Sequence, residues 1–202
     1  MTRKALLAVP LVLAAAAGFV LAGDPLAIGG KIPSTDVKMQ NVDGKDVTLA
    51  QVQKPAGTLV VFTCNHCPFA KAWESRIVAL GNEYAAKGIG VVAINSNDPK
   101  IAPEDDMGTM QQKAKEDGMQ FPYVVDATSS VAKAFGAMRT PEAFLFDKGG
   151  KLVYHGAIDD NKEDPKAVTS PYLKNALDAV VKGTDVAVKE TKSVGCGIKF
   201  RS

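Results

Sequence analysis

Hydrophobic and polar positions along the chain follow two different periods, and these predict strands and helices in turn. Residues 58–63 and 91–95 are continuous apolar runs, typical of strands that are buried on both faces of a sheet. Between them, apolar residues recur at steps of three and four from Phe69 to Tyr84, which predicts an amphipathic helix. Pro68 suits the first turn of this helix.

The same reasoning predicts the remaining elements. They are a hairpin over 36–49, a helix from Pro103 that ends at Gly118, a strand over 123–126, a helix over 129–136, a hairpin of strands 143–147 and 152–156, and a helix after Ser170-Pro171. Glu104, Asp105 and Asp106 would place acidic residues at the positive end of a helix dipole. Alternating strands and helices predict an α/β fold with a central mixed sheet and helices on both faces, opened by an N-terminal hairpin.

The N-terminus differs from the rest of the chain. Arg3 and Lys4 precede an uncharged apolar run over 5–22 that ends in a small residue, so residues 1–22 are predicted to be a signal peptide. An uncleaved membrane anchor is the alternative, because 18 apolar residues could just span a bilayer. Either alternative predicts export to a periplasmic or other extracytoplasmic compartment, where disulfides persist.

Composition limits the classes of function. The 202 residues carry 24 basic and 22 acidic side chains without a basic stripe, so nucleic acid is not expected as a partner. Three cysteines are too few for a disulfide scaffold in a chain of this length. The length favours one domain, and the last residues, 184–202, have no strong period and contain Cys196.

The candidate chemistry lies in Cys64-Asn65-His66-Cys67, where a buried strand ends and a helix begins. The N-terminus of a helix stabilises an anion, and the thiolate is the nucleophilic form of cysteine. We therefore predict that Cys64 attacks as a thiolate with a pKa below the usual value of about 8.5. Cys67 would resolve the mixed disulfide, and His66 would tune the reduction potential.

The chain resembles the redoxin branch of thioredoxin-fold proteins, which contains peroxiredoxins and exported thiol-disulfide oxidoreductases. The matching segments are NVDGK, VVFT, the CNHC pair, the inserted helix and strand around 103–126, and MRTPEAFLFD. The resemblance implies a thioredoxin-like fold over most of 30–183 and no organic cofactor. It also implies that Thr140-Pro141 is the cis-proline segment that shapes the substrate groove, and that the partner is a protein disulfide or a dithiol electron donor.

Three alternatives to thiol-disulfide exchange remain open. A peroxiredoxin-like peroxidase would use Cys64 or Cys67 against a hydroperoxide, with Arg139 as electrostatic help. In peroxiredoxins a threonine typically lies three residues before the reactive cysteine, whereas Thr63 lies one before Cys64 and four before Cys67. The pair could also be a purely structural disulfide. A non-catalytic copper-binding module would need a distant histidine, for which His155 is the candidate, and no metal site is assigned.

Two further features are interpreted from the sequence. Cys196, between two glycines, could be a third redox thiol, a buried apolar cysteine, or a link to another chain. Asn95, Asn97 and Asp98 follow a buried strand, where α/β sheets place ligands, but their chemistry is more typical of an ordinary polar turn.

Overall fold

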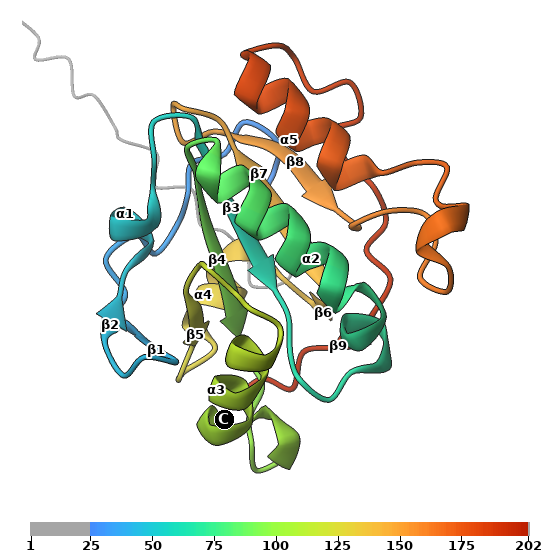
Figure 1. Ribbon diagram of the computed structural model, residues 1–202. Helices are drawn as coiled ribbons and strands as arrows, with labels where there is room; N and C mark the ends of the chain where they lie inside the picture. The colour runs from blue at the N-terminus through green and yellow to red at the C-terminus, as the bar shows by residue number, and fades with distance from the viewer. Residues whose placement is uncertain (1–24, 202) are drawn as a thin grey trace, which may run out of the picture.

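The computed structural model describes residues 25–201, which form a central sheet with helices packed against it (Figure 1). The seven strands lie in the order β2 (Asp46–Val47), β1 (Met39–Asn41), β5 (Tyr123–Val125), β4 (Ile89–Asn95), β3 (Gly57–Phe62), β7 (Glu142–Phe146) and β8 (Leu152–Gly156). The three central strands β5, β4 and β3 are parallel, whereas β1–β2 and β7–β8 are antiparallel pairs at the two edges. The predicted mixed sheet is therefore confirmed.

Helices cover both faces of this sheet, as predicted. The helices are α1 (Leu49–Val52), α2 (Pro68–Ala86), α3 (Met107–Glu116), α4 (Ser130–Phe135) and α5 (Tyr172–Lys182), with single 3-10 turns at Pro103–Asp105 and Pro165–Ala167. Buried residues of α2, α3 and α5 share one core cluster, and those of α1 and α4 share a second. Figure 1 shows α2 crossing one face of the sheet and α4 lying behind it.

The apolar run in β3 explains this two-sided packing. Leu59 and Val61 belong to the first core, whereas Val60 and Phe62 belong to the second. Successive side chains of a strand point to opposite faces, so only a continuously apolar strand can contribute to both cores. All six residues of β3 are buried. The CNHC segment therefore follows directly after a strand that is buried along its whole length.

Three elements were not predicted. They are α1 and the two strands of a separate small sheet, in which β6 (Arg139–Thr140) pairs with β9 (Cys196–Gly197). Each of these strands has two residues, too few for a hydrophobic period to be visible in the sequence. The pairing of β6 with β9 brings Cys196–Gly197 next to the N-terminal end of α2, and the chain then runs on toward α3 (Figure 1).

The C-terminal segment is packed against the domain. Ile198 is 8% exposed and joins the second core, and Phe200 packs against the same cluster. The Lys199 amide donates to Asn97 Oδ1 at 2.7 Å, and the Lys199 carbonyl accepts from the Asp98 amide at 2.7 Å. The proposed leader over 1–22 lies outside the described residues, and among residues 25–201 no helix is long and apolar enough to cross a membrane.

Candidate functional site

The cysteine pair lies where the strand-to-helix junction was predicted. β3 ends at Phe62, and Cys67 is the N-cap residue of α2, with Pro68 at the first helical position. Both thiols are free and almost fully buried, with 2% of Cys64 and none of Cys67 exposed. A small apolar cluster of Cys64, Cys67 and Ala70 surrounds the sulfurs. The pair is therefore shielded from solvent in this dithiol state.

Thr140 and Pro141 lie against the two sulfurs, as the resemblance implied. The Thr140–Pro141 peptide bond is cis. The Thr140 hydroxyl lies 3.1 Å from Cys64 Sγ, and the Thr140 carbonyl oxygen lies 3.3 Å from Cys67 Sγ. A single residue therefore contacts both members of the pair, once through its side chain and once through its backbone.

Asp105 organises the segment between the two cysteines. Its carboxylate accepts hydrogen bonds from the Asn65 amide at 2.6 Å and from the His66 amide at 3.3 Å. It also accepts from His66 Nδ1 at 2.5 Å and from Asn97 Nδ2 at 2.7 Å. A carboxylate can only accept, so His66 carries its proton on Nδ1. Asp105 is 1% exposed, and its buried charge is satisfied by four donors.

A second set of hydrogen bonds fixes Asn65 and Asn97. Asn65 Nδ2 donates to the Glu104 carbonyl at 2.8 Å, and the Tyr123 hydroxyl donates to Asn65 Oδ1 at 2.8 Å. Asn97 accepts from the Lys199 amide through its other side-chain atom. The CNHC segment is therefore held by the loop before α3, by β5 and by the C-terminal segment. Together these hydrogen bonds fix the orientation of the His66 ring.

The two thiols of the pair differ in their pKa values. The hydrogen bond from the Cys64 thiol lowers the pKa of Cys67 to about 4, against the opposing effect of burial. Hydrogen bonding to Cys67 raises the pKa of Cys64, and burial and the negative charge of Asp105 raise it further. The sequence predicts a lowered pKa for Cys64, whereas these contacts lower the pKa of Cys67 and raise that of Cys64. The role of Cys64 as the attacking thiol stays a prediction. The carboxylate beside Cys64 is the feature that the sequence did not reveal.

Cys196 lies beside the same pair. Residue 196 is opposite Thr140 in the β6–β9 ladder, and its side chain packs against the Cys64–Cys67 cluster. Burial and the neighbouring Cys67 raise the pKa of Cys196 to about 11. Arg139 Nη1 donates to the Gly195 carbonyl at 3.1 Å and so binds the segment that carries Cys196. The structure thus brings together three thiols from two distant parts of the chain.

The two histidines differ in their surroundings. Cys64, His66 and Asp105 offer ligand atoms within 4.8 Å of one another, the geometry of a candidate metal site. Both Asp105 oxygens already accept hydrogen bonds, so a metal ion would have to displace them. His155, the histidine of the copper alternative, donates or accepts at Nε2 with Glu142 at 2.7 Å and stacks on Phe144. His155 therefore has a local partner in the neighbouring strand.

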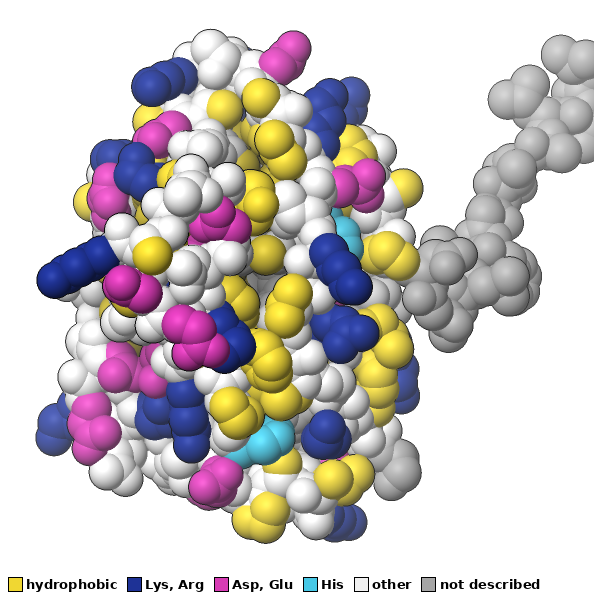
Figure 2. Space-filling model, turned by 90° about the vertical axis from the view of Figure 1, so that its right-hand side faces the viewer, with side chains coloured by type: hydrophobic (Ala, Val, Ile, Leu, Met, Phe, Trp, Pro, Cys, Tyr) yellow, Lys and Arg dark blue, Asp and Glu magenta, His cyan; other side chains and the backbone are white. Residues whose placement is uncertain are grey.

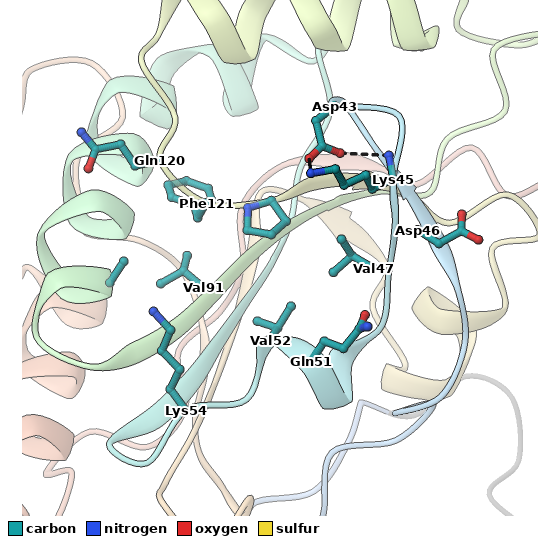
Figure 3. Close-up of a pocket in the computed structure, with 12 residues that line it drawn as sticks. Asp43, Lys45, Asp46, Val47, Gln51, Val52, Lys54, Val91, Gln120 and Phe121 are labelled. Carbon is teal, nitrogen blue, oxygen red and sulfur yellow. Dashed lines mark hydrogen bonds and ion pairs between the residues drawn. The ribbon is translucent and has the colours of Figure 1, made fainter.

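A cavity of about 390 Å³ opens elsewhere on the molecule (Figure 3). It lies near the amino ends of β3 and β4, between the turn of the β1–β2 hairpin, α1 and the segment before β5. Lys45 reaches Asp43 at its rim. No cysteine or histidine lines this cavity, whereas the sulfurs lie past the carboxyl end of β3. The redox-capable groups are therefore the candidate site.

Sequence reasoning missed four residues of this site. Asp105 was interpreted as part of a helix start, but it ends a 3-10 turn and points to the cysteine loop, while Asp106 caps α3. Asn97 was interpreted as an ordinary turn residue, and Asn65 and Tyr123 were assigned no role. The one usable signal was the position of Asn97 just after a central parallel strand, where sites form.

Solved structures of similar proteins share this fold. The chain is 40% identical to an uncharacterized conserved protein from Geobacillus kaustophilus, covering 90% of this chain and 96% of that one, with a TM-score of 0.82. It is 38% identical to a hypothetical protein from Sinorhizobium meliloti, covering 89% and 97%, with a TM-score of 0.81. A thioredoxin-like protein in the oxidized form, 21% identical over 79% of this chain and 99% of that one, shares the fold with a TM-score of 0.60.

Among curated proteins, the chain is 24% identical to the thiol-disulfide oxidoreductase ResA of Halalkalibacterium halodurans. The match covers 57% of this chain and 61% of that protein, which is less than two thirds of its length. The fold is thioredoxin-like, as the resemblance implied. Residues 28–155 match the AhpC/TSA family, and because this match spans more than half of the 202 residues, the chain belongs to that family.

Proposed function

We propose that this protein is a thiol-disulfide oxidoreductase whose Cys64 and Cys67 cycle between a dithiol and a disulfide. The observation that carries the proposal is the position of both sulfurs at the start of α2, each in contact with Thr140. The N-terminus of the helix favours a thiolate, and the low pKa of Cys67 makes it a good leaving group in exchange. The name of the ResA relatives supports the same chemistry.

The roles of the neighbouring residues follow from their contacts. In the direct form of the mechanism Cys64 attacks a partner disulfide and Cys67 resolves the mixed disulfide. His66, held by Asp105, tunes the balance between dithiol and disulfide. Thr140 and Pro141 line the groove in which an extended partner chain lies beside the sulfurs. The partner is a protein thiol or disulfide, and no organic cofactor takes part.

Export of the protein is part of the same proposal. It rests on residues 1–22, which have the charge and hydropathy pattern of a signal peptide. A periplasmic or other extracytoplasmic location would allow the Cys64–Cys67 disulfide to persist between turnovers. N-terminal sequencing of the protein recovered from its native host distinguishes a cleaved leader from an anchor. A start at Met1 or Thr2 in a water-soluble fraction would contradict both.

The test of the exchange activity combines a disulfide map with a turnover assay. After equilibration with glutathione buffers, peptide mass analysis should find a Cys64–Cys67 disulfide that forms at a defined potential. The protein should also accelerate the reduction of insulin by dithiothreitol. The Cys64→Ser/Cys67→Ser double variant, shown to be folded by thermal melting, should lose this acceleration. Unchanged acceleration in that variant would refute the proposal.

A thiol peroxidase is the second candidate, and one contact favours it. The sequence lacks a threonine at the usual spacing before the cysteines, but the Thr140 hydroxyl lies 3.1 Å from Cys64 Sγ. Attack of a Cys64 thiolate on hydrogen peroxide would give a sulfenic acid and release water after proton uptake, and Cys67 would then form the disulfide and release a second water. A rate with hydrogen peroxide no faster than that of a free thiol would exclude this candidate.

A further inference from the structure

Direct attack by Cys64 requires a sulfur that a partner can reach. Only 2% of Cys64 and none of Cys67 is exposed. Cys196 is partly exposed and packs against the same pair. Of the three cysteines, Cys196 is therefore the one with exposed surface, and it packs against the buried pair.

We propose that Cys196 is the thiol through which partners exchange disulfides with this protein, and that it passes the exchange to the buried pair through Cys67. The inference rests on the proposed function and adds to it the point of entry. Cys196 lies opposite Thr140 in the β6–β9 ladder, and the carbonyl of Thr140 lies 3.3 Å from Cys67 Sγ. Cys67 contacts both the Cys64 thiol and the Cys196 thiol, so it is the member of the pair through which Cys196 can exchange.

The backbone holds Cys196 in this position. A Cβ atom on Gly195 would lie 2.2 Å from the Thr140 carbonyl oxygen, so the absence of a side chain lets β9 approach β6. The Arg139 side chain binds the Gly195 carbonyl on the other side. After Cys196, the buried Ile198 anchors the segment in the second core. Cys196 is therefore fixed next to the pair.

The surface around Cys196 suits contact with a polypeptide. Five large hydrophobic residues are exposed in the described part of the chain, and two of them, Met138 at 48% and Val194 at 44%, flank β6 and β9. Figure 2 shows the face that is turned to the right in Figure 1, where hydrophobic side chains gather near the middle with lysine and arginine side chains beside them. A partner chain could cover these side chains while its sulfur reaches Cys196.

The reduction of the oxidised pair by a partner dithiol then proceeds in three exchanges. The Cys196 thiolate attacks Cys67 Sγ, the Cys64–Cys67 bond breaks, and Cys64 leaves with the electron pair and takes up a proton. A partner thiolate attacks Cys196 Sγ, and Cys67 leaves as a thiolate. The second partner thiol attacks the partner's own sulfur in the mixed disulfide and releases Cys196, which is reprotonated.

The three exchanges balance in electrons and in protons. The partner dithiol loses two electrons and becomes a disulfide, and the Cys64–Cys67 disulfide gains those two electrons. Cys64 keeps one proton and Cys67 remains a thiolate, so the other proton goes to water. The pKa of Cys67, about 4, favours its departure in the second exchange, because a less basic thiolate leaves faster. In the oxidised protein the Cys67 charge, one cause of the raised pKa of Cys196, is absent.

The first experiment traps the intermediate. In Cys64→Ser, oxidation with diamide should produce a Cys67–Cys196 disulfide, identified by peptide mass analysis under acid quench. The same treatment of Cys67→Ser should leave Cys64 and Cys196 without a bond to each other. Failure of Cys67 and Cys196 to pair in a folded Cys64→Ser variant would overturn the relay. This trap does not depend on any variant of Cys196.

The second experiment tests whether a partner dithiol reduces the Cys64–Cys67 disulfide through Cys196. Stopped-flow reduction of the oxidised protein by reduced thioredoxin, used as a protein dithiol, should be slowed roughly tenfold or more in Cys196→Ser, because the buried pair loses its access. Val188→Ser, a change at another exposed position of the C-terminal segment, should keep the wild-type rate. A wild-type rate in Cys196→Ser, with the Cys64–Cys67 disulfide still forming, would refute the relay and leave the proposed function intact. Absence of a Cys64–Cys67 disulfide in the wild type would refute the proposed function instead.

Discussion

Removal of the Asp105 carboxylate should destabilise the protein more than removal of its neighbour Asp106. Asp105 is 1% exposed and accepts four hydrogen bonds from Asn65, His66 and Asn97. Hydrogen bonds to a charged group contribute about 1.5–3 kcal/mol each, but donors that share one carboxylate do not add. Loss of one partner from a buried charged network costs about 3–5 kcal/mol, so Asp105→Ala should lower the free energy of unfolding by about 4 kcal/mol.

Asp106 provides a matched control on the adjacent position. Its carboxylate is exposed and caps α3 by accepting from the Thr109 amide at 3.0 Å. Loss of an N-cap side chain costs about 1 kcal/mol, so Asp106→Ala should be several times milder than Asp105→Ala. Both substitutions remove one negative charge from the same loop. The comparison therefore cancels the change in net charge and isolates the buried network.

Urea unfolding of both variants, followed by circular dichroism in the presence of a reductant, measures the difference. For a chain of this size 1 kcal/mol corresponds to roughly 2–4 °C in melting temperature, so Asp105→Ala should melt about 10 °C lower. The reductant keeps all three thiols free, so stability is compared in one redox state. A cost for Asp105→Ala no larger than that for Asp106→Ala would show that the CNHC segment does not depend on this carboxylate.

Two further predictions concern the sulfurs. Because the pKa of Cys67 is lowered to about 4, the reduced protein should show ultraviolet thiolate absorbance at neutral pH that disappears as the pH falls through that value. The lowered pKa of Cys67 should also add to the free energy of unfolding. This contribution should be fully present above the unfolded-state pKa of about 8.5 and should be lost as the pH falls to about 4. Cys67→Ser should abolish the neutral-pH signal, and its persistence there would assign the thiolate to Cys64. Gly195→Ala should slow exchange and lower the melting temperature, because its Cβ would lie 2.2 Å from the Thr140 carbonyl oxygen. Gly197→Ala should have neither effect, because the atom nearest to its Cβ would lie 3.9 Å away. Equal effects of the two alanine variants would contradict the close approach of β9.

The parts of the fold that the sequence predicted are those that depend on local patterns. β3 was predictable because a strand buried on both faces is apolar along its middle, and residues 59–62 form a short apolar run bounded by two threonines. α2 was predictable because its apolar residues repeat at helical spacing and a proline begins it. Cys64 and Cys67 were then found at the junction of two well-predicted elements.

The network around Asp105 could not be predicted in this way. An acid after a proline at the start of a helix is ordinary capping chemistry, and the sequence gives no sign that this carboxylate contacts residues forty positions earlier. A two-residue strand has no detectable period, so the pairing of Cys196 with Thr140 was also invisible. Both contacts arise from tertiary packing between segments that carry weak local signals.

The location of the thiolate follows from the same packing. Cys64 lies with His66 and Asp105 in a group whose ligand atoms are within 4.8 Å of one another. A thiolate on Cys64 would face the buried Asp105 carboxylate, and two unit charges at that separation repel by about 3 kcal/mol at an effective dielectric constant of about 20. A negative charge on Cys67 is instead stabilised by the Cys64 thiol, the Cys196 thiol and the Ala70 amide at the start of α2. These contacts favour a negative charge on Cys67 over one on Cys64, which would lie closer to Asp105. A lowered pKa makes Cys67 a good leaving group when a partner thiolate attacks the Cys67–Cys196 disulfide.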